Sequence, residues 1–200
     1  CINILSNYSF ADNNSIFKVI TSPRHERNKY ASAKSKLAFI SSSSVSKALA
    51  FFNALSMSFP VGEQYFMDAV RAGLQKLPPD AQQRFAPEVQ GFVGQEATHR
   101  RIHALFNGHL EALGFDNALE RRAKARMGAN AHFDVRIHLA ATAATEHLTA
   151  IFSDWMFRHP EALQGAEPRL QTLWMWHSAE EAEHCSTAFD LYKALGGNER

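Results

Sequence analysis

Four glutamates, two of them paired with a histidine, are the residues of this sequence best suited to chemistry. The motif Glu-x-x-His occurs twice, and two isolated glutamates stand in apolar segments: Glu96/His99, Glu181/His184, Glu63 and Glu146. Residues three apart on a helix share a face, so each pair can bind one metal ion from one side. Two isolated glutamates and two such pairs, on four helices, form the ligand set of dinuclear carboxylate-bridged metal sites. The pattern predicts a site for two metal ions inside a helix bundle.

His177 adds an imidazole to the second pair. It lies four residues before Glu181 and seven before His184, so all three side chains point the same way on a helix. One helix could then offer two imidazoles and a carboxylate to a single ion. The alternative is a core histidine packed beside Trp174 and Trp176.

Other side chains lie close enough to the predicted ligands to assist them. His103 follows the first pair by one turn and could be an extra ligand, a hydrogen-bond donor to a ligand, a proton shuttle or a packed core residue. His147 and Glu180 adjoin predicted ligands but are rotated by about 100° on a helix, which favours a supporting or a surface role. Tyr65, two residues after Glu63, is the nearby phenol to test for a redox role.

The setting of the isolated glutamates strengthens the metal hypothesis. Glu146 lies in residues 140–150, a run of mostly small residues that lets helices approach closely. An ionised carboxylate buried there is costly unless it is paired or bound to a metal. The alternative for Glu63 and Glu146 is a solvated helix face, and short motifs such as Glu-x-x-His also occur by chance.

The elements that must position these residues are all helical, because no strand-like alternation of useful length occurs. Four long helices are predicted, over residues 45–77, 80–113, 131–158 and 168–195. Pro60 should kink or restart the first helix, Pro87 should break the second, and Asp80 should cap it. The charged connection 115–130 is expected to be partly helical. We therefore predict an all-α, ferritin-like antiparallel four-helix bundle with a long connection between its second and third helices.

The offsets of the four glutamates from the connections predict that they lie at one height. Glu63 and Glu96 lie 14 and 16 residues from the turn between their helices, which is about 21 and 24 Å along each axis. Glu146 and Glu181 lie 12 and 13 residues from the next connection, or about 18 and 20 Å. A bundle-core site is compatible with these lengths.

Composition narrows the function classes. The 200 residues suit one domain, and we predict an irregular segment over 1–40 followed by a metal-binding domain over 41–197. The 21 basic and 20 acidic residues leave a net charge of +1, which favours neither nucleic acid nor an anionic membrane. No apolar run is long enough for a membrane span, and no secretion signal is recognisable. Two cysteines at opposite ends of the sequence form no disulfide framework, which favours a cytoplasmic location.

The sequence also resembles known families. Residues 51–63, 94–99, 144–147 and 176–184 carry a resemblance to a bacterial family labelled "predicted metal-dependent hydrolase", over roughly residues 45–195. More distantly, the ligand pattern is similar to that of ferritin-like diiron N-oxygenases, the arylamine oxygenases of antibiotic biosynthesis. Those enzymes also have a histidine four residues before the Glu of the last Glu-x-x-His. Carried over by position, the resemblance implies these metal ligands: Glu63, Glu96, His99, Glu146, His177, Glu181 and His184.

Several functions follow from such a site. The first is an O2-activating diiron oxidase or oxygenase acting on a small organic substrate, with iron favoured over manganese or zinc and with an unidentified electron donor. The second is a dinuclear metal-dependent hydrolase that uses a metal-activated water. Against the hydrolase, few basic residues lie near the ligands, Arg100 and Arg101 being the exceptions. Ferritin-like metal storage is the third function. The fourth alternative, a purely structural bundle, leaves the buried carboxylates unexplained. A homodimer is a candidate assembly.

Overall fold

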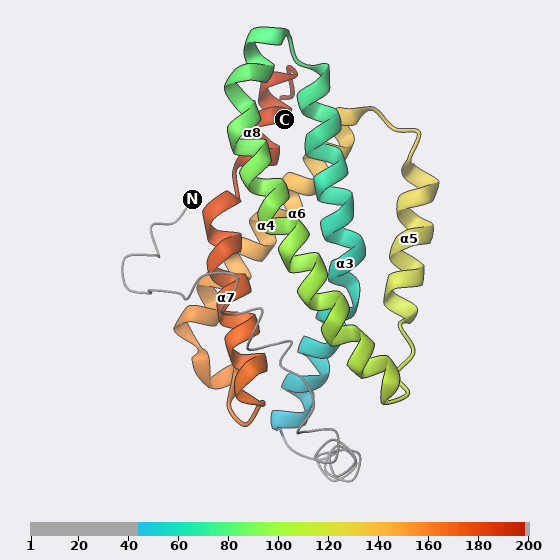
Figure 1. Cartoon of the computed structure of the whole chain (residues 1–200), viewed down its shortest axis with the longest axis vertical. Helices are drawn as coiled ribbons and strands as arrows, with labels where there is room; N and C mark the ends of the chain where they lie inside the picture. The colour runs from blue at the N-terminus through green and yellow to red at the C-terminus, as the bar shows by residue number, and fades with distance from the viewer. Residues whose placement is uncertain (1–43, 199–200) are drawn as a thin grey trace.

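The computed structural model describes the backbone of residues 44–198 and the side chains of residues 50–183 and 185–198, and its regular elements are all helices (Figure 1). The helices are α3 Ser44–Lys76, α4 Pro79–Ala112, α5 Ala118–Asn130, α6 Val135–Arg158, α7 Pro168–His184 and α8 Thr187–Ala194, with a short 3-10 helix, η2 Pro160–Leu163. The all-α prediction is confirmed for this part of the chain. The predicted N-terminal segment over 1–40 lies outside the described residues. None of the described helices is both long and apolar enough to cross a membrane.

Two prolines lie inside helices without ending them. The predicted break at Pro87 is wrong, because α4 continues through it, and α3 likewise runs through Pro60 without restarting. A proline removes the hydrogen bond to the carbonyl four residues earlier. For Pro87 that carbonyl belongs to Gln83, an exposed residue, so water can replace the lost donor. Asp80 does not cap α4 as predicted. The helix begins at Pro79, a favoured first position for proline, and Asp80 lies in its first turn.

The third and fourth predicted helices also differ from the structure at their ends. The third begins at Val135 rather than at 131, because Asp134 caps it by accepting a hydrogen bond from the Arg136 amide at 2.9 Å. The fourth is interrupted after His184, and α8 follows as a separate helix. Neither proline nor glycine marks this interruption, so local breaker residues did not predict it. The connection before α6 does contain the expected helical segment, α5.

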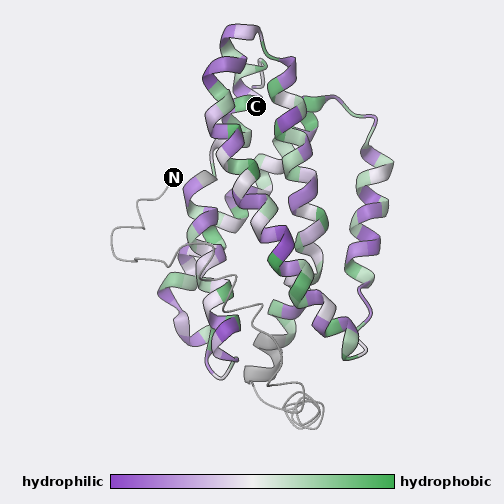
Figure 2. Ribbon diagram, viewed as in Figure 1, coloured by the Kyte–Doolittle hydropathy of each residue, from purple (hydrophilic) through white to green (hydrophobic). Residues whose placement is uncertain are grey.

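The helices pack in pairs. α3 lies along α4, α6 packs on α7 and α8, and α5 stands on the outer side of α3 (Figure 1). Figure 2 shows hydrophilic residues along α5, and none of its residues is buried. The core is formed by the other helices, which also position the candidate site.

A polar layer separates two apolar clusters of the core. One cluster contains Val70, Leu77, Val89, Phe92, Leu139, Ala188 and Leu191, and another contains Phe52, Met156, Leu163 and Trp174. On α3, Glu63 lies between Phe52 and Val70. On α6, Glu146 lies between Leu139 and Met156. Both glutamates are buried, so the helices bury ionisable groups at mid-length, where a core made only for stability would be apolar.

Candidate metal centre

Five of the predicted ligands meet in the interior. They come from α3, α4 and α7, and each residue is at most 5% exposed: Glu63, Glu96, His99, His177 and Glu181. They form two overlapping groups, Glu63 with His99 and His177, and Glu96 with His99 and Glu181. Within each group, one ligand atom per residue lies within 4.8 Å of the others. Since His99 belongs to both groups, the two sets of donors adjoin one another.

His99 connects the centre to a supporting carboxylate. Its Nδ1 lies 3.7 Å from Glu96 Oε1 and 3.4 Å from Glu181 Oε1, while its Nε2 lies 3.0 Å from Glu180 Oε2. The other oxygen of Glu180 accepts a hydrogen bond from Trp176 Nε1 at 2.9 Å. Burial disfavours a charged imidazole, but the hydrogen bond with Glu180 and the nearby carboxylates of Glu181 and Glu96 outweigh it and raise the pKa of His99 well above its usual value. A carboxylate on the outer nitrogen is the usual way to orient a metal-binding histidine.

His177 connects the centre to a buried polar chain. Its Nε2 lies 2.8 Å from Glu181 Oε1, and its Nδ1 lies 2.7 Å from His103 Nε2. His103 Nδ1 lies 2.8 Å from Ser56 Oγ. Ser56 Oγ donates to Asn107 Oδ1 at 2.8 Å, and Asn107 Nδ2 donates to the main-chain oxygen of Ser56 at 2.9 Å. The chain therefore runs from α7 through α4 to α3.

Pro60 explains why this chain is anchored at Ser56. Because proline has no N–H, the Ser56 carbonyl four residues earlier loses its usual helical donor. The side-chain amide of Asn107 supplies the missing hydrogen bond. A flipped amide would place two oxygens against each other here, so this contact settles which Asn107 atom faces the Ser56 hydroxyl.

The donors along the chain can then be assigned. Since the Ser56 hydroxyl hydrogen goes to Asn107, Ser56 Oγ must accept a hydrogen bond from His103 Nδ1. Burial and the neighbouring histidines lower the pKa of His103 well below its usual value, and burial also lowers the pKa of His177, so both rings are neutral. His103 Nε2 is then an acceptor, and His177 Nδ1 donates to it. The remaining nitrogen, His177 Nε2, turns a lone pair toward Glu181, and such a contact requires a proton shared by the two atoms or a cation bound to both.

Glu63 provides a second indication of a cation. The residue is 3% exposed, and neither carboxylate oxygen has a hydrogen-bond partner within the described part of the chain. Burial raises the pKa of Glu63 well above its ordinary value. The charges of Glu96 and Glu181 raise it further, while His99 and Arg100 oppose the shift. An unpartnered carboxylate in the interior is costly, and a bound metal ion removes that cost. The donors present therefore fit a metal ion.

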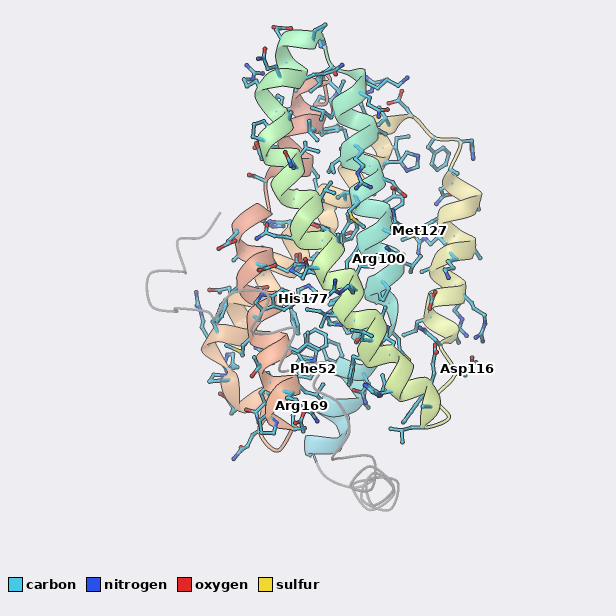
Figure 3. The ribbon with its side chains drawn as sticks, in the orientation of Figure 1. Phe52, Arg100, Asp116, Met127, Arg169 and His177 are labelled. Atoms are coloured by element: carbon cyan, nitrogen blue, oxygen red, sulfur yellow. The ribbon has the colours of Figure 1, made fainter. Side chains whose placement is uncertain are left out.

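Aromatic rings enclose the imidazoles. The Phe59 ring centroid lies 4.9 Å from those of both His103 and His177, and Trp176 packs edge-on against His99 at 5.1 Å. The His99 and His177 rings stack with centroids 4.1 Å apart. Figure 3 shows His177 on α7, in the region between α7 and α4. This apolar enclosure limits the access of water to the centre.

The remaining sequence candidates have other positions. Glu146 is fully buried on α6 but belongs to neither group of donors, and the side chain of His184 lies outside the described residues. His147 is exposed, which favours its surface role over a supporting one. The Tyr65 hydroxyl lies 2.9 Å from His138 Nδ1 on α6, so this phenol is paired with a histidine that the sequence analysis did not single out. Burial raises the pKa of Tyr65.

Two members of the polar chain were missed from sequence. Ser56 and Asn107 carry no metal-ligand pattern, yet each had a signal. Ser56 precedes Pro60 by four residues, so its carbonyl must be open, and Asn107 follows His103 by one turn on the same face of α4. The supporting role considered for His103 is consistent with its contacts.

Comparison with known proteins gives one result. A family model described as "Predicted metal-dependent hydrolase" matches residues 23–200 of the chain. No curated protein and no solved structure matches the chain. The match includes every residue of the candidate centre and confirms the first of the resemblances seen in the sequence.

Proposed function

The chain belongs to the predicted metal-dependent hydrolase family, and we propose that its buried centre binds two metal ions and hydrolyses an ester, amide or phosphoester bond. The observation that carries the proposal is the convergence of unpartnered Glu63 oxygens and the His177 Nε2 lone pair on one buried site. Neither group is stable in the interior without a proton or a cation. The family match supplies the class of reaction.

The proposed ligands are the seven residues predicted from the sequence: Glu63, Glu96, His99, Glu146, His177, Glu181 and His184. In this proposal α3, α4, α6 and α7 act as a ferritin-like four-helix bundle, each contributing one of the glutamates. What supports it is that all four glutamates are buried and that α6 packs against both α3 and α7. Glutamate and histidine together suit iron, manganese or zinc.

The protein's own part in the reaction is to hold and shield this site. When bound, the metal ions would lower the pKa of a coordinated water and so provide a nucleophile at neutral pH. Glu180 orients His99, and the chain through His103 orients His177. The aromatic rings around both histidines exclude other water molecules.

Two other functions were predicted from the sequence, and an experiment must distinguish them from hydrolysis. The diiron oxidase or oxygenase, our first prediction from the ligand pattern, has no support in the family match. Metal storage has no specific observation in its favour. The native metal, an electron donor, a homodimer and a cytoplasmic location all stay predictions.

Metal analysis combined with two assays tests the proposed function. The protein is expressed with iron, manganese or zinc, its metal content is measured, and it is assayed with para-nitrophenyl esters and phosphoesters and for O2 uptake. We expect about two ions per chain and hydrolysis that a chelator abolishes. Reduced protein that consumes O2 without hydrolysing any substrate would favour the oxygenase, and many irons per chain would favour storage. A chain that binds no metal would contradict all three functions.

Ser56→Ala is expected to weaken metal binding although the Ser56 side chain is hydrogen-bonded to His103 and Asn107 rather than to a proposed ligand whose side chain the structure describes. Loss of the hydroxyl leaves His103 Nδ1 without its acceptor, so His103 and His177 lose their assigned tautomers. Disturbing a residue that orients a ligand typically lowers metal affinity about 10–100-fold. The measurements are metal affinity and the nitrogen chemical shifts of the two histidines.

Ser58→Ala is the matched control for this variant. Ser58 lies two residues further along α3, and among the described residues its hydroxyl hydrogen-bonds only to the Leu55 carbonyl. It should keep the wild-type affinity and tautomers. Equal affinity in both variants would remove the polar chain from the proposal.

A further inference from the structure

A groove of about 760 Å³ lies between α3, α4 and α5. Its walls include Pro60 and Val61 from α3, Ala97 and Arg100 from α4, and Lys124 from α5. The volume suits a small organic molecule. Alanines and a glycine on the α4 side leave the space open, and a Cβ added at Gly108 would meet nothing within 4 Å.

The groove lies one helical turn from proposed ligands on two helices, although none of those ligands lines it. Pro60 lies one turn before Glu63 on α3, and Arg100 lies one turn after Glu96 on α4, so each shares a helix face with a proposed ligand. Asn107 lines the groove and also belongs to the polar chain that ends at His177. The charge of Arg100 reaches the centre, because it lowers the pKa of Glu63 against the effect of burial.

The described cations that line the groove are Arg100, Arg101 and Lys124, and Arg100 is the one open to a ligand, because Arg101 and Lys124 both have partners. Lys124 is paired with Glu120, which also accepts a hydrogen bond from Asn117 Nδ2 at 3.0 Å. Arg100 makes no hydrogen bond or ion pair within the described residues, and it is exposed. In Figure 3, Arg100 is labelled on the side of α4 nearer α3, and His177 on the side nearer α7. A guanidinium presents a planar pair of donors that matches a carboxylate or a phosphate.

We propose that this groove is the substrate site and that Arg100 binds an oxyanion, carboxylate or phosphate, carried by the substrate beside its scissile bond. The inference rests on the proposed function, which it deepens by naming the substrate class. Few basic side chains lie near the ligands in the sequence, and Arg100 supplies the charged contact that an anionic substrate needs. The neutral floor formed by Pro60, Val61 and Ala97 leaves room for the rest of the substrate.

Anion binding by the metal-free protein tests this site separately from catalysis. Inorganic phosphate and glutarate are titrated calorimetrically into chelator-treated protein, so neither anion can bind through a metal ion. Arg100→Gln is expected to weaken binding at least about tenfold, since it removes a charge-assisted hydrogen bond. Arg84→Gln is the matched control, because Arg84 is exposed on the same helix, outside the groove, against Phe85. Circular dichroism verifies that both variants are folded.

The outcomes separate the two proposals. Binding that depends on Arg100 supports the groove, and the tighter of the two anions tells carboxylate from phosphate. If that binding is present but no metal-loaded protein hydrolyses any substrate, the groove stands and the hydrolase fails. If neither anion binds wild-type protein, or Arg100→Gln binds as wild type does, the groove proposal is overturned, whatever neutral esters the enzyme cleaves.

Discussion

Glu63→Gln is expected to abolish hydrolysis and to lower metal affinity at least about 100-fold, because residues that only orient a ligand already cost about 10–100-fold. Glutamine keeps the size of the side chain but cannot carry the negative charge that balances a cation. The same change should make the metal-free protein more stable at neutral pH. A buried carboxylate without partners is destabilising, and a neutral amide is less so.

This opposite effect on function and on stability distinguishes a ligand from a structural residue. Metal content and affinity are measured by elemental analysis and titration, and unfolding by urea in the presence of a chelator. Glu88→Gln, which removes an exposed carboxylate from α4, is the control and should change neither quantity. A Glu63→Gln protein with full metal content would exclude Glu63 from the centre.

Removal of the metal is expected to reverse the pH dependence of stability. Metal-loaded protein should gain stability as pH rises, because the ligands must lose protons to bind. In the metal-free protein, the contribution of Glu63 to stability should instead decrease as pH rises. Burial raises the folded-state pKa of this residue well above 4.5. Its contribution is therefore fully present below the unfolded pKa and is lost as pH rises through the folded pKa.

The histidines add to this dependence in both directions. The raised pKa of His99 means that its contribution is present below 6.5 and is lost as pH rises through the folded value. The lowered pKa values of His103 and His177 act oppositely, because their contributions are present above 6.5 and are lost as pH falls through the folded values. Wild type and Glu63→Gln share all three histidines. The difference between their free energies of unfolding therefore reports the contribution of Glu63, together with its electrostatic interaction with His99.

We expect that difference to be small below pH 4.5 and to grow with pH in favour of Glu63→Gln. Urea unfolding at a series of pH values, with chelator present, measures it. A constant difference across the series would show that Glu63 is not held in its protonated form by burial.

Most helices were predictable because their signals are local. The second long helix was predicted to end at 113 and ends at Ala112, shortly before Gly114 with its φ of +92°, and Pro168 begins the fourth as predicted. The predictions at Pro87 and Asp80 were wrong because local rules overestimated how strongly a proline breaks a helix and misplaced the start of the second helix. Proline weakens a helix at one carbonyl, and a long helix packed along a neighbour tolerates that loss when water can reach the carbonyl.

The sequence by itself determined which residues could be ligands, because Glu-x-x-His spacing is a property of a single helix. Which atoms face one another was decided only by the tertiary structure. His103 contacts Ser56, which is 47 positions away in the sequence, and His177, which is 74 positions away. Glu180 contacts His99, which is 81 positions away. Helix rotation and packing set these contacts, and neither is encoded in the spacing along one helix. The groove beside Arg100 has the same origin, since side chains from three different helices form its walls.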